Sequence, residues 1–211
     1  MLTFFHAPGS CSNGILFLLN EVGAEFECER IDLRLGDQRQ LRYRALNPKG
    51  KVPALRLPEG EVLTEFQAIA LWLASAYPQA GVLPRGQLGQ ARMMEALDFI
   101  VGSVHMRGFT FLKMPGKFHT DADAQKAIQA YGRSEVERCL ILLSDMLGDK
   151  DYLLGDFSAA DAALFFVLHW AEEETLTLPP NLAACLQRLR ARPSYTATKP
   201  GLVRNSVRPT C

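Results

Sequence analysis

The sequence predicts a chain of two halves, an α/β half over residues 1–80 followed by an all-α half. Strand-like apolar runs alternate with helix-like segments only in the first 80 residues, whereas apolar residues recur at helical spacing in the rest of the chain. Between the halves, residues 81–89 are rich in glycine and proline, which is typical of a linker. We therefore expect one domain at 1–80, the linker at 81–89, a helical domain at 90–197 and a coil tail at 198–211.

Turn residues divide the first half into short strands and helices. In order, the pattern predicts a strand at 2–5, a helix ending near Gly23, a strand at 25–29, a loop with a short helix at 34–46, a hairpin with strands at 52–57 and from Val62, and a helix that opens at Thr64-Glu65 and stops at Pro78. This order of strands and helices is typical of a thioredoxin-like domain.

Helices account for the second half. The pattern predicts them through Met93–Val104, from Asp121 to Gly148, after Ser158, and from Asn181 to Arg192. Ser158 and Asp161 have the spacing of a capping box, in which each side chain bonds the backbone N–H of the other residue. We assign both a structural rather than a catalytic role, because the helix that they open is apolar on nearly every face and belongs in the domain interior.

The turn from the first strand into the first helix holds a candidate reactive cysteine. Pro8 and Gly9 end the strand, and the Ser10 hydroxyl is placed to cap the helix. Cys11 then falls in the first helical turn, where unpaired N–H groups and the helix dipole lower a cysteine pKa from ~8.5 into the range of roughly 3.5–7.5. The pattern fits a small apolar residue packed under a turn equally well, so both interpretations stay open at this point.

Charge and cysteine content exclude several classes of function. Lysine plus arginine and aspartate plus glutamate both number 23, so no net charge favours nucleic acid or an anionic membrane as a partner. No apolar run approaches the ~18 residues of a membrane span, and we expect a cytoplasmic protein. The five cysteines are scattered, which predicts neither a disulfide framework nor a metal site, and Cys28, Cys139 and Cys185 are expected in the core.

Four segments in this order resemble the cytosolic glutathione transferases, over the chain from Leu2 to about Pro193. They are Pro8-Gly9-Ser10-Cys11-Ser12, Asn47-Pro48-Lys49-Gly50-Lys51-Val52-Pro53-Ala54-Leu55, Leu63-Thr64-Glu65 and Phe157-Ser158-Ala159-Ala160-Asp161. The cysteine, with a histidine at position 105 in the first long helix of the second half, is most similar to the bacterial beta class. The resemblance implies the glutathione transferase fold, glutathione as co-substrate, a homodimer, and detoxification of a small hydrophobic electrophile.

The same resemblance implies roles for the thiol side of the site. Cys11 would point at the glutathione sulfur, with Ser10 as the alternative activating group, and His105 would reach the thiol region. His105 also fits a core histidine on an apolar helix face.

Roles for the peptide side are implied as well. Lys51, Val52 and Pro53 would bind glutathione, with Val52–Pro53 in cis, although the ~5–6% frequency of cis X–Pro bonds alone favours an ordinary edge proline. Glu65 would receive the γ-glutamyl ammonium, and the helix that it opens, beginning with Phe66, would turn its N–H groups towards the γ-glutamyl carboxylate. Glu65 also fits an acidic residue that merely favours a helix N-terminus.

The chain departs from the family pattern at three points, one of which is the loop Arg34-Leu35-Gly36, where the lysine often found in the family is missing. Met106-Arg107 stand between His105 and Gly108-Phe109, one residue more than the pattern has, so the end of this helix is expected to differ. Phe66 stands where many members have serine, which leaves only a backbone N–H for the carboxylate.

Other functions stay open on sequence alone. A glutathione-dependent isomerase or dehalogenase would use the same scaffold, and a cysteine at position 11 also allows thiol–disulfide exchange. A non-catalytic, transferase-like binding protein would have lost its affinity for glutathione, and the intact Val52-Pro53 and Glu65 positions count against it.

Overall fold

The computed structural model describes residues 1–202, with side chains placed as far as Thr198. The chain divides into two compact units. The first contains residues 1–84 together with the segment from Leu189 onward, and the second is Arg85–Arg188. The described end of the chain, from Leu189, belongs to the first unit, whereas the predicted boundaries assign it to the helical domain and the tail. The prediction of a coil beyond residue 202 lies outside the described residues.

A mixed four-stranded sheet forms the centre of the first unit. The strands lie in the order β2-β1-β3-β4, with β1 parallel to β2 and the other neighbours antiparallel. Their bounds are β1 (Leu2–His6), β2 (Phe26–Arg30), β3 (Ala54–Arg56) and β4 (Val62–Thr64). All five residues of β1 are buried, because this strand has neighbours on both edges and on both faces. The predicted α/β architecture is therefore confirmed.

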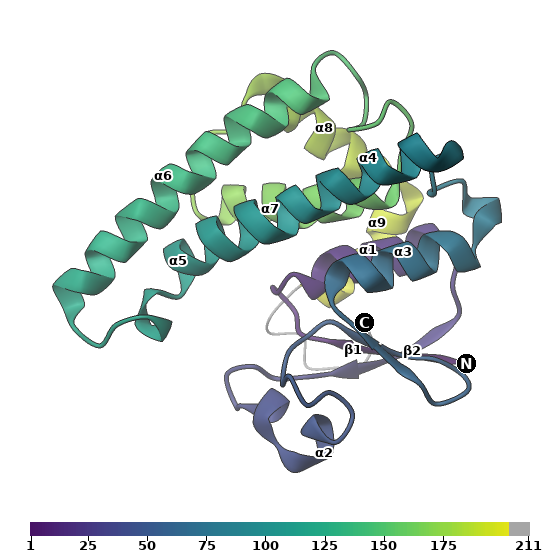
Figure 1. Cartoon of the computed structure of the whole chain (residues 1–211), viewed down its shortest axis with the longest axis horizontal. Helices are drawn as coiled ribbons and strands as arrows, with labels where there is room; N and C mark the ends of the chain where they lie inside the picture. The colour runs from purple at the N-terminus through teal and green to yellow at the C-terminus, as the bar shows by residue number, and fades with distance from the viewer. Residues whose placement is uncertain (203–211) are drawn as a thin grey trace. The chain divides into compact units, whose positions relative to one another are not determined.

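Helices cover both faces of this sheet, as Figure 1 shows. They are α1 (Ser12–Glu21) and α3 (Phe66–Ala76) on one face, and η1 (Asp37–Arg39) and α2 (Leu41–Arg44) on the other. The short helix η2 (Pro78–Ala80) follows α3. On the α2 face, the rings of Phe5 and Tyr43 pack edge to face with centroids 5.7 Å apart. The alternation of side chains along β1 thus supplies apolar contacts to both layers.

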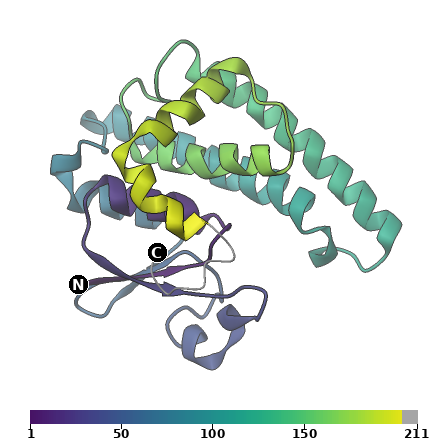
Figure 2. The same cartoon turned by 180° about the vertical axis from the view of Figure 1, so that it is seen from behind.

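The C-terminal segment of the described chain completes the first unit. Helix α8 (Pro180–Ala191) is followed by α9 (Pro193–Leu202), which packs along α1 (Figure 2). Thr198 is fully buried, and its hydroxyl donates to the Ser194 carbonyl at 2.8 Å. The expected coil is therefore wrong for residues 198–202, which form the end of a helix.

The second unit is a bundle built around two long rods. One rod runs without a break through α4 (Gly86–Asp98), η3 (Phe99–Phe109) and α5 (Thr110–Lys113), and the other is α6 (Ala122–Leu147) after the short η4 (Pro115–Lys117). They lie side by side in Figure 1. Since α4 already begins at Gly86, the linker prediction of 81–89 is too long. The segment η3 is a π-helix, the form that accommodates an extra residue within a helix, and it contains the extra residue found between His105 and Gly108.

Helix α7 (Ala159–Glu173) is the buried helix of this bundle, and its first turn carries the predicted capping box. The Ser158 N–H donates to Asp161 Oδ2 at 2.8 Å, and the other carboxylate oxygen, Oδ1, accepts from the Leu153 N–H at 3.0 Å. Both side chains are almost fully buried. Asp161 therefore satisfies backbone groups that would otherwise be buried without partners.

The cysteines agree only in part with the prediction. Cys139 and Cys185 are buried in the core. Cys28 is only half-buried on β2 and is disulfide-bonded, so its assignment to the core is wrong. Over residues 1–202 we find no helix with the length and apolar character needed to cross a bilayer. The same residues contain no group of three or more side chains arranged to hold a metal ion.

Candidate functional site

A tight turn between β1 and α1 presents the predicted cysteine. Gly9 has φ +76°, a left-handed conformation that suits glycine, and the Ser10 N–H closes the turn on the Ala7 carbonyl at 3.1 Å. The Ser10 hydroxyl accepts the Ser12 N–H at 3.1 Å, as expected of a capping side chain, while Cys11 occupies the N-cap position itself. Cys11 is consequently held at the point where the strand becomes a helix.

The surroundings of Cys11 favour the neutral form of its thiol. Its Sγ lies 3.7 Å from the Val52 carbonyl oxygen, to which it donates a weak hydrogen bond. Burial is the main reason that the pKa of Cys11 is raised to about 12; Glu65 raises it further, and backbone N–H groups and Lys51 oppose the shift. The expectation of a lowered pKa at this helix start is therefore wrong, because desolvation outweighs the helix terminus.

The segment opposite Cys11 is held by buried polar groups. The Lys51 carbonyl accepts the Tyr43 hydroxyl at 2.6 Å and the Asn47 side-chain amide at 2.8 Å. Val52–Pro53 is a cis peptide bond, as the family resemblance implied. The backbone of residues 51–53 is thus fixed directly before β3.

Glu65 is set at the start of α3 in an uncommon backbone conformation. Its φ is +70°, which is rare for a residue other than glycine and occurs mostly where function requires it. The carboxylate pairs with Lys49 Nζ at 2.7 Å, and the same ammonium reaches the Thr64 hydroxyl at 2.8 Å. Both charged side chains are about half exposed, so the pair is accessible to a ligand.

The next residue of α3 behaves differently. The Phe66 side chain is 3% exposed and belongs to the core, so the only groups it offers at this helix start are those of its backbone. This was expected from the sequence, because a phenylalanine stands where many members of the family have a serine. The Lys49–Glu65 pair was not expected, because sixteen residues separate its members and no local pattern marks such a contact.

The hydrogen bonds that link Ser10 to the buried Ser12 and His6 were also not predicted from the sequence. His6 Nδ1 lies 2.7 Å from the Ser12 hydroxyl, which in turn lies 2.7 Å from the Ser10 hydroxyl. His6 and Ser12 are 1% and 0% exposed. In the sequence His6 stands at the end of an apolar strand, and no local pattern pairs it with the serines, so only the fold of the turn brings it to them.

His105 lies in the second unit, on η3, inside a cluster of aromatic rings. Its imidazole packs edge to face against Phe166 and Trp170, with centroids 5.6 and 5.2 Å apart. Lys113 Nζ lies 5.4 Å from the centroid of the same indole ring. The core-histidine interpretation accounts for these contacts, and none of them involves another predicted site residue.

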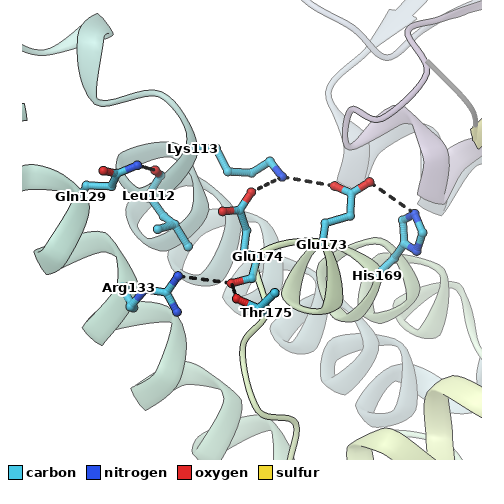
Figure 3. A network of polar contacts seen from close by, with 8 residues as sticks. All are labelled: Leu112, Lys113, Gln129, Arg133, His169, Glu173, Glu174 and Thr175. Carbon is cyan, nitrogen blue, oxygen red and sulfur yellow. Dashed lines mark hydrogen bonds and ion pairs between the residues drawn. The ribbon is translucent and has the colours of Figure 1, made fainter. Parts of the chain in front are cut away.

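Lys113, which contacts this cluster at Trp170, also belongs to a network of polar contacts, which Figure 3 shows. Lys113 bridges Glu173 at 3.2 Å and Glu174 at 2.7 Å, and His169 lies 3.6 Å from the Glu173 carboxylate. Arg133 donates to the Glu174 carbonyl at 3.2 Å. Since Lys113 is only 14% exposed, the network joins the end of α5 firmly to the end of α7.

The first unit therefore gathers most of the predicted site residues on one set of loops. Cys11 and Val52 are in contact, and the charges of Lys51 and Glu65 are close enough to influence the Cys11 thiol. A carboxylate, an ammonium group, a helix start and fixed backbone groups can together hold a zwitterionic peptide that carries a thiol.

Comparison with known proteins identifies the family. Residues 9–76 match the model of the glutathione S-transferase N-terminal domain, and residues 101–193 match that of the C-terminal domain. Glutathione S-transferase GstA of Escherichia coli O157:H7 is 35% identical over 201 residues, which cover 91% of this chain and 94% of that protein.

Two solved structures extend this comparison. A bacterial beta-class glutathione S-transferase of Sphingomonas chungbukensis is 34% identical, with a TM-score of 0.82 over 95% of this chain and all of the other. A glutathione transferase homolog from Sulfitobacter, with bound glutathione, is 29% identical, with a TM-score of 0.88 over 94% of this chain and 97% of the other. The chain belongs to the glutathione S-transferase family and is similar to its bacterial beta-class members.

Proposed function

We propose that the protein is a cytoplasmic glutathione transferase that activates the thiolate of glutathione for attack on a small hydrophobic electrophile. The observation that carries this proposal is the contact of Cys11 with the Val52 backbone, within reach of the charges of Lys51 and Glu65. A binding protein that had lost glutathione would have no use for this combination.

The peptide part of glutathione is bound by the loops of the first unit. The half-exposed Glu65 carboxylate receives the γ-glutamyl ammonium, in competition with or beside Lys49. The N–H of Phe66 and the first turn of α3 receive the γ-glutamyl carboxylate, since a helix N-terminus favours an anion. The backbone of Val52 pairs with the cysteinyl unit, flanked by Lys51 and Pro53.

The protonated state of Cys11 favours conjugation over thiol–disulfide exchange. Because its pKa is raised to about 12, Cys11 is mostly a thiol at pH 7, and exchange through Cys11 requires the thiolate. A neutral thiol, in contrast, can donate a hydrogen bond to the glutathione thiolate. The thiolate sulfur then supplies an electron pair for a new bond to the electrophilic carbon, and the bond from that carbon to its leaving group breaks, so that the leaving group departs with the bonding pair.

The remaining assignments belong to this proposal. We propose that His105 acts on the glutathione thiol, as do Cys11 and Ser10, and we expect a homodimer, as is typical of the family. Glutathione is the co-substrate, and no nucleic acid, membrane or metal takes part. Detoxification is the role that such a conjugation would serve.

Calorimetric titration with glutathione tests the proposal, followed by a conjugation assay with an aromatic halide. Glu65→Gln removes the carboxylate charge and should weaken glutathione binding by about tenfold, since hydrogen bonds to charged groups contribute roughly 1.5–3 kcal/mol. Glu61→Gln, an exposed carboxylate on the same hairpin, is the matched control and should bind as the wild type does. No binding of glutathione at millimolar concentration would disprove the proposal.

A further inference from the structure

Three side chains of the first unit form a continuous chain of hydrogen bonds that leads from a buried imidazole to the site. His6 Nδ1 and the Ser12 hydroxyl are 2.7 Å apart, and the hydroxyls of Ser12 and Ser10 are 2.7 Å apart. Two backbone groups fix the middle of the chain: the Ala7 N–H donates to Ser12 Oγ at 3.1 Å, and the Ser12 N–H donates to Ser10 Oγ at 3.1 Å. His6 and Ser12 are buried, whereas Ser10 is partly exposed beside Cys11.

Counting donors and acceptors leaves two directions for this chain. A hydroxyl has one hydrogen and two lone pairs, and a backbone N–H occupies one lone pair on each serine. In the inward direction, Ser10 donates to Ser12 and Ser12 donates to His6 Nδ1. In the outward direction, His6 Nδ1–H donates to Ser12 and Ser12 donates to Ser10, whose own hydrogen is then available to a ligand.

A bound thiolate distinguishes these directions. In the inward direction, the Ser10 oxygen would present a lone pair to a thiolate, which is repulsive. In the outward direction, every dipole of the chain points at the negative charge, and the successive hydrogen bonds polarise one another. The Ser12 hydroxyl then donates to Ser10 rather than to the Ala7 carbonyl, which lies farther away at 3.2 Å.

We propose that His6 and Ser12 are positioning residues that direct the Ser10 hydroxyl hydrogen to the glutathione thiolate. This inference rests on the proposed function, because it concerns the same bound thiol. It makes Ser10 the principal donor and Cys11 the weaker one, since an O–H group is a stronger donor than an S–H group. His6 does not touch the substrate; it acts through the two serines.

A double-mutant cycle tests the inference, with the ultraviolet absorbance of the bound thiolate followed against pH. Ser10→Ala should raise the pKa of bound glutathione by about one unit, a tenfold loss of thiolate below that pKa. His6→Phe should raise it by a smaller amount, because Ser12 is then free to donate to Ala7. In the Ser10→Ala background, His6→Phe should cause no further shift. A His6 that only fills space would cause the same shift in both backgrounds, and that result would overturn the inference.

Thr3→Val is the matched control on the same strand. It removes a buried hydroxyl that accepts from Arg56 at 3.1 Å and leaves the chain of three side chains intact, so the thiol pKa should not change.

A second measurement uses the unaltered protein, should a variant fail to fold. Nitrogen NMR of the imidazole rings, in a chain with only four histidines, reports which nitrogen carries the hydrogen. In the glutathione complex, His6 should be protonated on Nδ1. A His6 with a bare Nδ1 in that complex would overturn the inference and leave the proposed function standing, provided that the thiolate absorbance is present. Absence of that absorbance with saturating glutathione would instead overturn both.

Discussion

At the scale of single residues, the pKa of Cys11 is set by two opposing effects, its position at a helix start and its removal from water. Its place at the start of α1 favours a thiolate, and the backbone N–H groups there do lower its pKa. Burial raises the pKa by more, and the result is a thiol with a pKa of about 12. The sequence could indicate the first effect, because it depends on local spacing. It could not indicate the second, because burial depends on contacts with distant parts of the chain, such as the Val52 carbonyl 41 residues away.

Cys11 should therefore react slowly with alkylating reagents at neutral pH, because little of it is thiolate. Because the pKa is raised, the thiolate population grows about tenfold per pH unit up to about pH 12. Iodoacetamide labelling of the Cys11 peptide, followed by mass spectrometry between pH 6 and 10, should accelerate throughout that range. A rate that levels off below pH 8 would contradict the neutral thiol, and labelling in 6 M urea supplies the reference rate of an exposed cysteine.

At the scale of elements, the capping box of α7 was visible in the sequence because its residues are three apart. Its energetic weight comes from burial, since Ser158 and Asp161 lie at a helix start without access to water. The predicted strands of the first unit are confirmed for the same reason: alternation, turn residues and proline act over a few residues.

Ser158→Ala should lower the free energy of unfolding by about 1–2 kcal/mol, the range for loss of a helix N-cap. Ser134→Ala is the matched control, because the Ser134 hydroxyl is exposed and donates only within its own helix, to the Tyr131 carbonyl. Urea unfolding of both variants measures the difference. Equal stability of the two variants would show that the cap contributes nothing.

Two elements escaped prediction because their determinants are not local. The extra residue before Gly108 signalled a change near the helix end, and the π-helical form of η3 became visible only in the structure. The helix predicted from Asn181 to Arg192 was expected to be the last one. It does end before Pro193, at Ala191, but Pro193 is also the first residue of α9, where a proline is well suited because its missing N–H would have no partner.

The rods of the second unit approach each other closely at two glycines, Gly108 and Gly132. A Cβ at Gly132 would clash with the Leu112 nitrogen and lie 2.9 Å from the Gly108 oxygen. Gly132→Ala should therefore destabilise the protein by about 1–3 kcal/mol, as overpacking does. Gly102→Ala, in the same bundle but facing open space, should be neutral or stabilise by about 0.4–1 kcal/mol. Thermal unfolding of the pair compares them, and equal midpoints would refute the close approach.

At the scale of the whole molecule, the first unit is discontinuous in sequence. Glu21, near the end of α1, accepts hydrogen bonds from Arg192 and Ser194, and α9 lies along α1. The basic residues of this region are plain in the sequence, but no local pattern pairs them with a carboxylate 171 positions away. Domain boundaries drawn from composition consequently missed the returning segment.

The free energy of unfolding should depend on pH through the ionisation of Glu21. Burial opposes its ionisation, but the hydrogen bonds from Arg192 and Ser194 outweigh burial and lower its pKa. A carboxyl group with a lowered pKa stabilises the fold above its unfolded value, near 4.5, and loses that contribution as pH falls through the folded value. Glu21→Gln should lower the free energy of unfolding, measured in urea at pH 7, by about 1–3 kcal/mol, and the deficit should shrink below pH 4.

Glu27→Gln, an exposed carboxylate on β2, is the control and should match the wild type at both acidities. A deficit that stays constant from pH 7 to pH 3 would mean that the Glu21 charge is not responsible.

The return of α9 to α1 also sets an order of events during synthesis. The ribosome releases residues 1–84 first, yet the α1 surface that α9 covers stays uncovered until residues 193–202 have emerged. The second unit lies wholly within that interval, so it can fold while the first still waits for its last helix. A released chain that ends at residue 188 would contain the whole second unit, but its α1 would lack the helix that covers it in the first unit.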